Sequence, residues 1–374
     1  MNCLRVNPAG TEYYAWLASA CMPSEMVFRI MEIYPDPAVC HDAFMHQDEQ
    51  LMDIIRDRFR ELLAGNGTKQ KMDRMRELTD KHGISVIRYD GPAYPDALRK
   101  ISLPPAFLFF QGQIQCLENR AVAMVGSRAA SYSGQKAARK TACGLSAHGV
   151  SIISGLACGI DAASHQGCMD GGSPTIAVTA TGLDTVYPKD NIRLRDEILS
   201  GSGLILSEYA PGEKPAGWHF PYRNRIIAGL GQALVLMEAK IRSGSMTTVS
   251  HALDQGKDVF VYPGEPESPF FEGNHQLLRE GGIYFTCAED ILEDLHWLDN
   301  QSAVRQNSDC SGKHKADTPE QAAVLQALTP GSLGFDQLVN QTGLKPSVLM
   351  STLTVLQISG IVEALPGKQY RLKN

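Results

Sequence analysis

The sequence predicts an α/β protein with a mostly parallel sheet, a helical segment before it and a small mixed domain after it. Apolar runs alternate with helical stretches from Ala121 to about Trp297, which is the strand–helix–strand pattern of a parallel sheet. Residues 1 to about 80 instead carry apolar residues at helical spacing. A polar, aperiodic stretch from 298 to 316 precedes a tail in which helix and strand patterns return. We therefore expect three domains, with a linker before the last.

Composition places the chain among soluble globular proteins. It has 374 residues, 43% hydrophobic and 20% charged, with a net charge of −6, so a nucleic acid would have to bind at a local basic patch. We find no apolar run near the roughly 20 residues that a membrane-spanning helix needs, and no signal peptide. Nine cysteines without a C-x-x-C pair indicate reduced thiols, with neither a metal site nor a disulfide frame. We expect a cytoplasmic protein without a cofactor.

Residues 1–82 are predicted to form a helical domain. Glu12 to Ala20, Ser24 to Ile33, Asp48 to Leu63 and Met72 to His82 have helical periodicity, and Gly83 is a typical C-terminal cap. Two interpretations are open, a packing module or a module that touches DNA or a partner. Acidic residues along these helices favour packing, because carboxylates repel phosphate: Asp48, Glu49, Asp53, Asp57 and Glu61.

Residues 83–297 are predicted to contain the sheet. Two strands come first, Ile84 to Ile87 and Phe107 to Phe110, separated by a proline-rich passage that excludes a long helix. The later crossovers are long enough to place their strands in parallel, covered on both faces. The predicted strands are Val122–Val125, Ser151–Ile153, Thr175–Val178, Leu204–Leu206, Ala233–Met237 and Val259–Tyr262.

Small, hydroxyl and basic residues follow the predicted strands where helices begin. Ligands of parallel sheets bind at this edge, and glycine backbone, serine hydroxyls, helix N-termini and arginine forks suit phosphate. One such turn would mean little, but four on one edge predict a phosphate-bearing ligand. The predicted binding residues are Gly126, Ser127, Arg128, Ser131, Gly155, Lys189, Arg223, Asn224, Arg225, Ser243, Gly244 and Ser245.

Other polar residues have simpler explanations. Asp161 and His165, four residues apart, are expected to cap a helix and to make a local hydrogen bond rather than to catalyse. Glu208 is expected to pair with a nearby arginine. The aromatics beside Arg223 fit base stacking and loop packing equally well: Trp218, His219, Phe220 and Tyr222. Neither the dinucleotide fingerprint G-x-G-x-x-G nor the P-loop is present.

Several stretches of the predicted sheet domain carry a family resemblance. They include VGSR at 125–128, ISGLACGID at 153–161, TGLDTVYPK at 181–189, FPYRNRIIAGL at 220–230, SGSMTT at 243–248 and EGNHQLLREGG at 272–282. In order and spacing this pattern resembles the DprA/Smf family over roughly residues 85–295. The resemblance implies an extended Rossmann-like domain that binds single-stranded DNA, hands it to the RecA recombinase in natural transformation, and does not catalyse a reaction.

The resemblance also implies features outside the binding groove. It implies a SAM-like N-terminal helical domain. It further implies a homodimer formed through the end of the sheet domain, which in this chain points to His275, Leu277 and Leu278.

The tail, residues 317–374, is predicted to be a winged helix. Thr318-Pro319-Glu320-Gln321 is a capping box at the start of a helix. Helices follow at Phe335 to Gln341 and Pro346 to Ser359, then strands at Ile361 to Leu365 and Gln369 to Leu372. From residue 318 onward, 4 basic residues face 3 acidic ones, and the third helix lacks early base-reading residues. A protein-contact role is therefore favoured over sequence-specific DNA reading.

An enzyme is the alternative class. Nucleoside-monophosphate hydrolases of the lysine-decarboxylase-like group use similar turns, with the motif P-G-G-x-G-T-x-x-E. This chain has SGSMTTVSH at 243–251 and lacks both the glycine pair and the glutamate, which favours a binding protein.

Overall fold

A computed structural model describes residues 10–298, 318–328, 332–358, 361–365 and 369–372. The chain divides into two compact units, Met1–Gln306 and Asn307–Asn374. The first unit contains both the N-terminal helices and the sheet. All but the first residue of the predicted linker, 298–316, lie outside the described residues.

The first unit is built on a nine-stranded sheet in the order β1-β2-β6-β5-β4-β3-β7-β8-β9. From β6 to β9 all neighbours are parallel, whereas β1 and β2 pair antiparallel at one edge. The predicted mostly parallel α/β fold is confirmed. The strands are β1 (Ser85–Arg88), β2 (Phe107–Gly112), β3 (Ala121–Val125), β4 (Ser151–Ser154), β5 (Ile176–Thr179), β6 (Leu204–Ser207), β7 (Leu234–Leu236), β8 (Val259–Val261) and β9 (Ile283–Tyr284).

The strand order reverses at β3. The chain runs outward from β3 through β4 and β5 to β6, then returns to place β7 on the other side of β3. Ala123 accordingly pairs with Ile153 on β4 and with Leu234 on β7. Loops that leave β3 and β4 diverge from those that leave β7, and such a reversal opens a crevice at the carboxyl ends of the strands.

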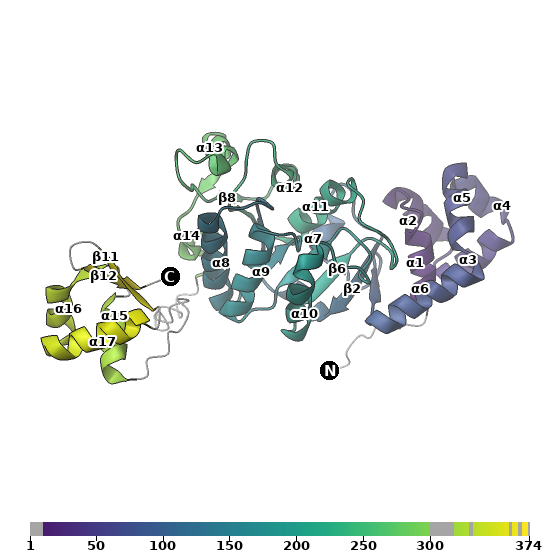
Figure 1. The fold of residues 1–374 in the computed structure, drawn as a ribbon. Coiled ribbons are helices and arrows are strands. Elements are labelled where there is room, and N and C mark those ends of the chain that lie inside the picture. Colours follow the sequence, from purple (N-terminus) through teal and green to yellow (C-terminus); the bar gives the residue numbers. More distant parts are fainter. Residues whose placement is uncertain (1–9, 299–317, 329–331, 359–360, 366–368, 373–374) are drawn as a thin grey trace. The chain divides into compact units, whose positions relative to one another are not determined.

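Helices cover both faces of the sheet (Figure 1). One face buries Ile226, Val249 and Leu277 in a shared core, and the other buries Ala142, Cys168 and Ile291. The helices of this part are α7 (Asp96–Arg99), η1 (Ile114–Glu118), α8 (Tyr132–Ala147), α9 (Ile160–Gly171), η2 (Lys189–Asn191), α10 (Ile192–Ser200), α11 (His219–Leu230), α12 (Gly244–Asp254), η3 (Pro269–Phe271), α13 (Glu272–Arg279) and α14 (Ala288–Asp294).

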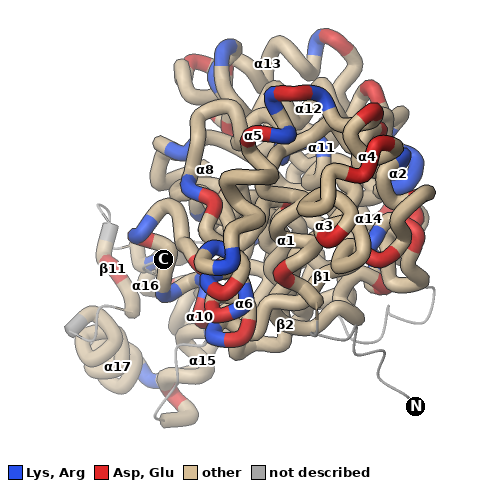
Figure 2. The backbone as a smooth tube through the Cα atoms, turned by 90° about the vertical axis from the view of Figure 1, so that its right-hand side faces the viewer, with Lys and Arg blue, Asp and Glu red and all other residues tan. Residues whose placement is uncertain are grey.

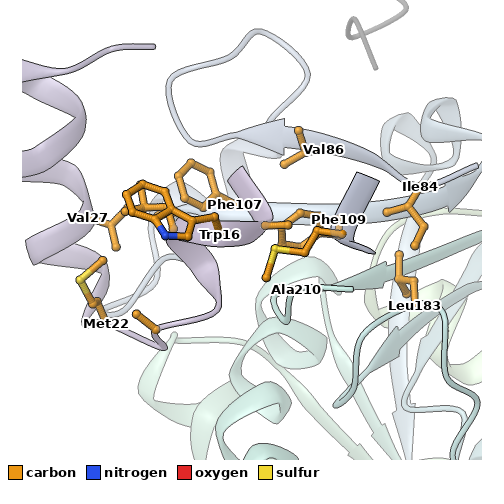
Figure 3. Close-up of a cluster of buried hydrophobic side chains, with 14 of the residues drawn as sticks. Trp16, Met22, Val27, Ile84, Val86, Phe107, Phe109, Leu183 and Ala210 are labelled. Carbon is orange, nitrogen blue, oxygen red and sulfur yellow. The ribbon is translucent and has the colours of Figure 1, made fainter. Parts of the chain in front are cut away.

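Six helices precede the sheet and lie together at its β1–β2 end (Figure 1). Trp16 belongs to the same hydrophobic cluster as Phe107 and Phe109 of β2 (Figure 3), so this segment is anchored on the sheet. Lys and Arg alternate with Asp and Glu along α6 (Figure 2). The helices are α1 (Thr11–Ala18), α2 (Ser24–Ile33), α3 (Pro37–Met45), α4 (Glu49–Ile54), α5 (Asp57–Asn66) and α6 (Lys69–His82).

The predicted helix from Asp48 to Leu63 is wrong as a single element. The chain is extended at Ile55 and Arg56, between α4 and α5. Asp48 instead caps α4 by accepting from the Leu51 N–H at 3.1 Å. Helix α3 was not predicted, although Asp36 caps it and Pro37 begins it, a typical N-terminal signal.

The second unit is a winged helix, as predicted. Three helices pack on a three-stranded sheet in the order β10-β12-β11. Their core includes Val324, Leu338 and Leu353. The elements are α15 (Pro319–Leu328), β10 (Leu333–Gly334), α16 (Phe335–Thr342), α17 (Pro346–Ile358), β11 (Val362–Leu365) and β12 (Gln369–Leu372).

Candidate functional site

A cleft of about 730 Å³ opens where the strand order reverses. Its walls come from the turn after β3, the starts of α9 and α12, and the segment that leads into α11. Eight of the twelve predicted binding residues line it: Gly126, Ser127, Arg128, Arg223, Asn224, Ser243, Gly244 and Ser245.

Three helices begin beside this cleft. Residues from the first turns of α9, α11 and α12 line it, and the first N–H groups of a helix have no partner within the helix. The hydroxyls of Ser243 and Ser245 lie 2.7 Å apart at the start of α12. Backbone N–H groups and hydroxyls in this arrangement suit the oxygens of a phosphate.

Arg128 is an exposed cation in the lining of the cleft. Its side chain is exposed, and no Asp or Glu of the described residues forms an ion pair with it. The guanidinium lies 4.7 Å from the ring centroid of Phe220, whose ring is 5.5 Å from that of Tyr187. Tyr187 was not among the predicted site residues, although it stands two positions before Lys189. A cation beside aromatic faces suits a ligand that has both phosphates and bases.

Two glycines allow the turns around the cleft to pack closely. A Cβ on Gly126 would lie 2.6 Å from the Ile160 side chain, and one on Gly159 would lie 2.4 Å from the Ser127 carbonyl. Gly159 also has a φ of +77°, a conformation that side chains disfavour. The turn after β3 therefore rests directly on the start of α9.

Arg223 lines the cleft but is only 3% exposed. Its guanidinium donates to the carbonyls of Gly155, at 3.0 Å, and Val178, and so joins the ends of β4 and β5. Burial lowers its pKa to about 10. These bonds make Arg223 a residue that positions the cleft rather than a free phosphate ligand.

Asp161 lies beside Arg223 and ties down the loop after β4. Its carboxylate accepts from the N–H groups of Gly155, at 3.1 Å, and Ala157, at 3.4 Å. It does not cap α9, so that expectation is wrong. His165 makes the expected local bond, to Thr175 at 2.7 Å. Burial, with the Arg223 charge nearby, lowers the His165 pKa to about 3, so this imidazole is neutral near pH 7.

Arg225 points away from the cleft, so its predicted place there is wrong. It donates to the carbonyls of Leu103, at 2.8 Å, and Tyr222, at 3.0 Å, and pairs with Glu208 at 2.6 Å. The expected arginine partner of Glu208 is thereby confirmed. Gly155 and Lys189 also lie outside the cleft lining, Gly155 packed under the Arg223 guanidinium and Lys189 exposed at the start of η2.

Ser131 was also predicted to face the ligand, but it is bonded within the protein. Its N–H donates to Glu238 at 3.0 Å, and its hydroxyl donates to the same carboxylate. Glu238, at the end of β7, is fully buried. Its carboxylate therefore occupies the N-terminus of α8, the position where dinucleotide-binding sheets hold a pyrophosphate.

The predicted dimer residues differ in their exposure. Leu277 is only 4% exposed and belongs to the core, so it is unavailable to a partner and its prediction is wrong. His275 and Leu278 are half-buried on α13, with His275 in contact with the Pro263 carbonyl at 2.8 Å. Tyr284 on the edge strand β9 is 58% exposed.

Two kinds of feature are absent from the described residues. Within residues 10–298 and the described parts of the tail, no helix is long and apolar enough to cross a membrane. Over the same part of the chain, no three His, Cys, Asp or Glu side chains gather as metal ligands would.

The fold and cleft define an α/β protein with an open cleft at the carboxyl ends of its strands. Comparison with known proteins matches residues 85–296 to DNA recombination-mediator protein A and residues 312–368 to the DprA winged helix domain. The chain belongs to the DprA/Smf family.

Relatives support this assignment. The DNA processing protein DprA of Streptococcus pneumoniae is 46% identical over 204 residues, which are 54% of this chain and 72% of that protein. An X-ray structure of DprA from the same species matches with a TM-score of 0.65 and 35% identity, covering 76% of this chain and 97% of that one. DNA processing protein A from Helicobacter pylori, whose structure describes a single-stranded DNA binding mode, matches with a TM-score of 0.52 and 27% identity, covering 57% and 95%.

Proposed function

We propose that this protein binds single-stranded DNA in the cleft without reading its sequence, protects incoming DNA, and loads the RecA recombinase onto it during natural transformation. The observation that carries the proposal is Arg128, an exposed cation without an acidic partner in the described residues, among three helix N-termini. The Helicobacter pylori relative, described as binding single-stranded DNA, supports the choice of ligand.

The cleft residues divide into two roles in this proposal. Ser127, Arg128 and Asn224 contact phosphates together with the start of α12, residues 243–245, while Arg223 holds the strand ends in place. Lys189, exposed near Tyr187, meets the strand where it leaves the cleft. Because these contacts are to the DNA backbone, they carry no sequence information.

Fluorescence anisotropy of a labelled oligo-dT tests the proposal. With roughly three to five phosphate contacts, the logarithm of the affinity should fall with the logarithm of salt concentration at a slope of about −2 to −4. Arg128→Ala should weaken binding and reduce the magnitude of that slope by about one-half to one.

Arg193→Ala is the matched control. The substitution removes the same charge as Arg128→Ala. Arg193, however, lies on α10, is paired with Glu197 and is outside the cleft lining. Affinity that falls equally in both variants, or a slope near zero in the wild type, would contradict the proposal.

We also propose that the working form is a homodimer that pairs through β9 and α13. The β9 strand is one of the two edge strands of the sheet and pairs only with β8 among the described residues. Such an edge, with Tyr284 exposed beside it, is a natural pairing surface.

A further inference from the structure

A second cavity, of about 460 Å³, lies between the N-terminal helices and the sheet. We call it the aromatic pocket, and its defining residues are Phe107, Glu208, Tyr209, Trp218 and Tyr222. Met22 and Val27 of the N-terminal segment also line it, beside Phe107 (Figure 3).

The aromatic pocket and the cleft share a wall. Gly217, Phe220 and Pro221 line the cleft, whereas Trp218 and Tyr222, from the same short segment, line the pocket. The start of α11 therefore separates the cleft from the aromatic pocket, and a strand would have to pass over it to enter both.

Trp218 is placed to stack on a flat ligand. Its side chain is 56% exposed, which is unusual for so large an apolar group. Tyr209 and Tyr222 hold it edge-on, each with its ring centroid 6.3 Å from that of Trp218. The His219 ring packs against it as well, with the two centroids 4.2 Å apart. These contacts fix the indole, and its exposed part remains available to stack on a base.

Glu208 offers one free acceptor in this pocket. One carboxylate oxygen takes the Arg225 guanidinium at 2.6 Å. The other is buried and has no hydrogen-bond partner among the described residues. An unpaired buried carboxylate oxygen is costly, and an N–H donor from a ligand would satisfy it.

The charged residues around the aromatic pocket suit a neutral base better than a phosphate. Burial, with Glu213 and Glu208 nearby, raises the pKa of the Cys21 thiol beside the pocket to about 11. The lining holds two acids, Glu25 and Glu208, and one cation, Arg58, so it carries no net positive charge to hold a phosphate. The backbone of a bound strand would therefore stay in the cleft, near Arg128.

We infer that the aromatic pocket receives one unstacked base of the bound strand, with its ring against Trp218 and its N–H edge on the free oxygen of Glu208. The inference rests on the proposed function and adds to it a base preference at one position. Guanine suits this single acceptor, because either its N1–H or its adjacent N2 amino group can donate to it, whereas the N3–H of thymine is flanked by carbonyls.

The first test uses the full chain and a labelled oligo-dT of about 12 nucleotides. Trp218→Ala should weaken binding roughly fivefold or more, as expected for a lost base stack, and leave the salt slope unchanged because no phosphate contact is lost. Trp218→Phe keeps a flat ring and should restore most of the affinity. DNA should quench tryptophan fluorescence in the wild type and in Trp297→Phe, but not in Trp218→Phe.

The second test changes the DNA instead of the protein, and so avoids variants of Glu208 that also lose the Arg225 pair. One guanine is moved through the oligo-dT, and at one position it should tighten binding about fivefold. Inosine, which lacks the N2 amino group, should recover only part of that gain. Oligo-dT binding that needs Arg128 but is unaffected by Trp218→Ala, without quenching, would overturn the inference and leave the proposed function standing. Absence of any binding to oligo-dT would overturn both.

Discussion

At the scale of single residues, the cleft depends on polar groups that the ligand would not touch. Arg223 joins the ends of β4 and β5 through the carbonyls of Gly155 and Val178, and Asp161 holds the loop between them. These buried bonds fix the loop that leads into α9, and the turn that carries Arg128 rests on the start of α9. Stability and binding are thus assigned to different arginines.

Arg223→Ala should destabilise the protein by about 3–5 kcal/mol, because it leaves Asp161 buried beside unpaired carbonyls. Urea unfolding measures this change. Arg128→Ala, at an exposed position, should stay within about 0.5 kcal/mol of the wild type while losing DNA affinity. Equal stability of the two variants would refute the separation of roles.

His165 should make folding sensitive to acid. Its pKa is about 3 in the folded protein against an ordinary value of 6.5, so between these values the unfolded chain binds more protons. Stability due to this residue is therefore complete above pH 6.5 and declines as the pH falls toward 3. Below pH 6 the wild type should lose about 1.4 kcal/mol per pH unit more than His165→Asn. Parallel pH profiles from urea unfolding would contradict this expectation.

The sequence predicted which residue types occur along the cleft, but only in part which of these side chains face it. Arg223 and Arg225 are two positions apart on α11 and point to opposite sides of the helix, since each residue turns about 100°. Only one of them could therefore face the cleft. The bond from Ser131 to Glu238 joins residues 107 positions apart, and no local pattern reveals such a contact.

At the scale of helices and strands, prediction succeeded where hydrophobic patterns were long. The strands from β1 to β8 follow the predicted apolar runs within a few residues. The β9 strand was missed because two residues give no periodicity, and the α4–α5 break was missed because the apolar spacing continues through it.

Tyr284→Arg should convert the proposed dimer to monomers, because it places a charge at the free sheet edge where apolar contact is expected. Sedimentation equilibrium measures the change. Tyr132→Arg, at a position 77% exposed on α8, is the matched control and should remain dimeric. A monomeric wild type, or an unaffected Tyr284→Arg, would rule out this surface.

At the scale of the whole molecule, the binding features belong to the first unit. The cleft is lined entirely from residues 125–248. Helix α17 of the winged helix contains no Lys or Arg, and exposes Val348, Met350 and Val355. A surface of this kind supports the expected protein-contact role better than a role in holding DNA.

Removal of residues 307–374 should therefore leave oligo-dT affinity within about twofold of the full chain, with the same salt slope, because the phosphate contacts remain. Anisotropy titrations of the two proteins side by side measure this. A loss of more than tenfold, or a lower slope, would assign DNA contacts to the winged helix.

Glu238 has a consequence for the protein in a living cell. Its carboxylate fills the N-terminus of α8, where related sheets take up nucleotide cofactors. Free ATP and NAD are abundant in cells and rise and fall with metabolism. Because the Glu238 carboxylate already occupies this helix end, a nucleotide phosphate cannot bind there. Under the proposed function, capture of DNA at the neighbouring cleft would proceed alike in fed and starved cells.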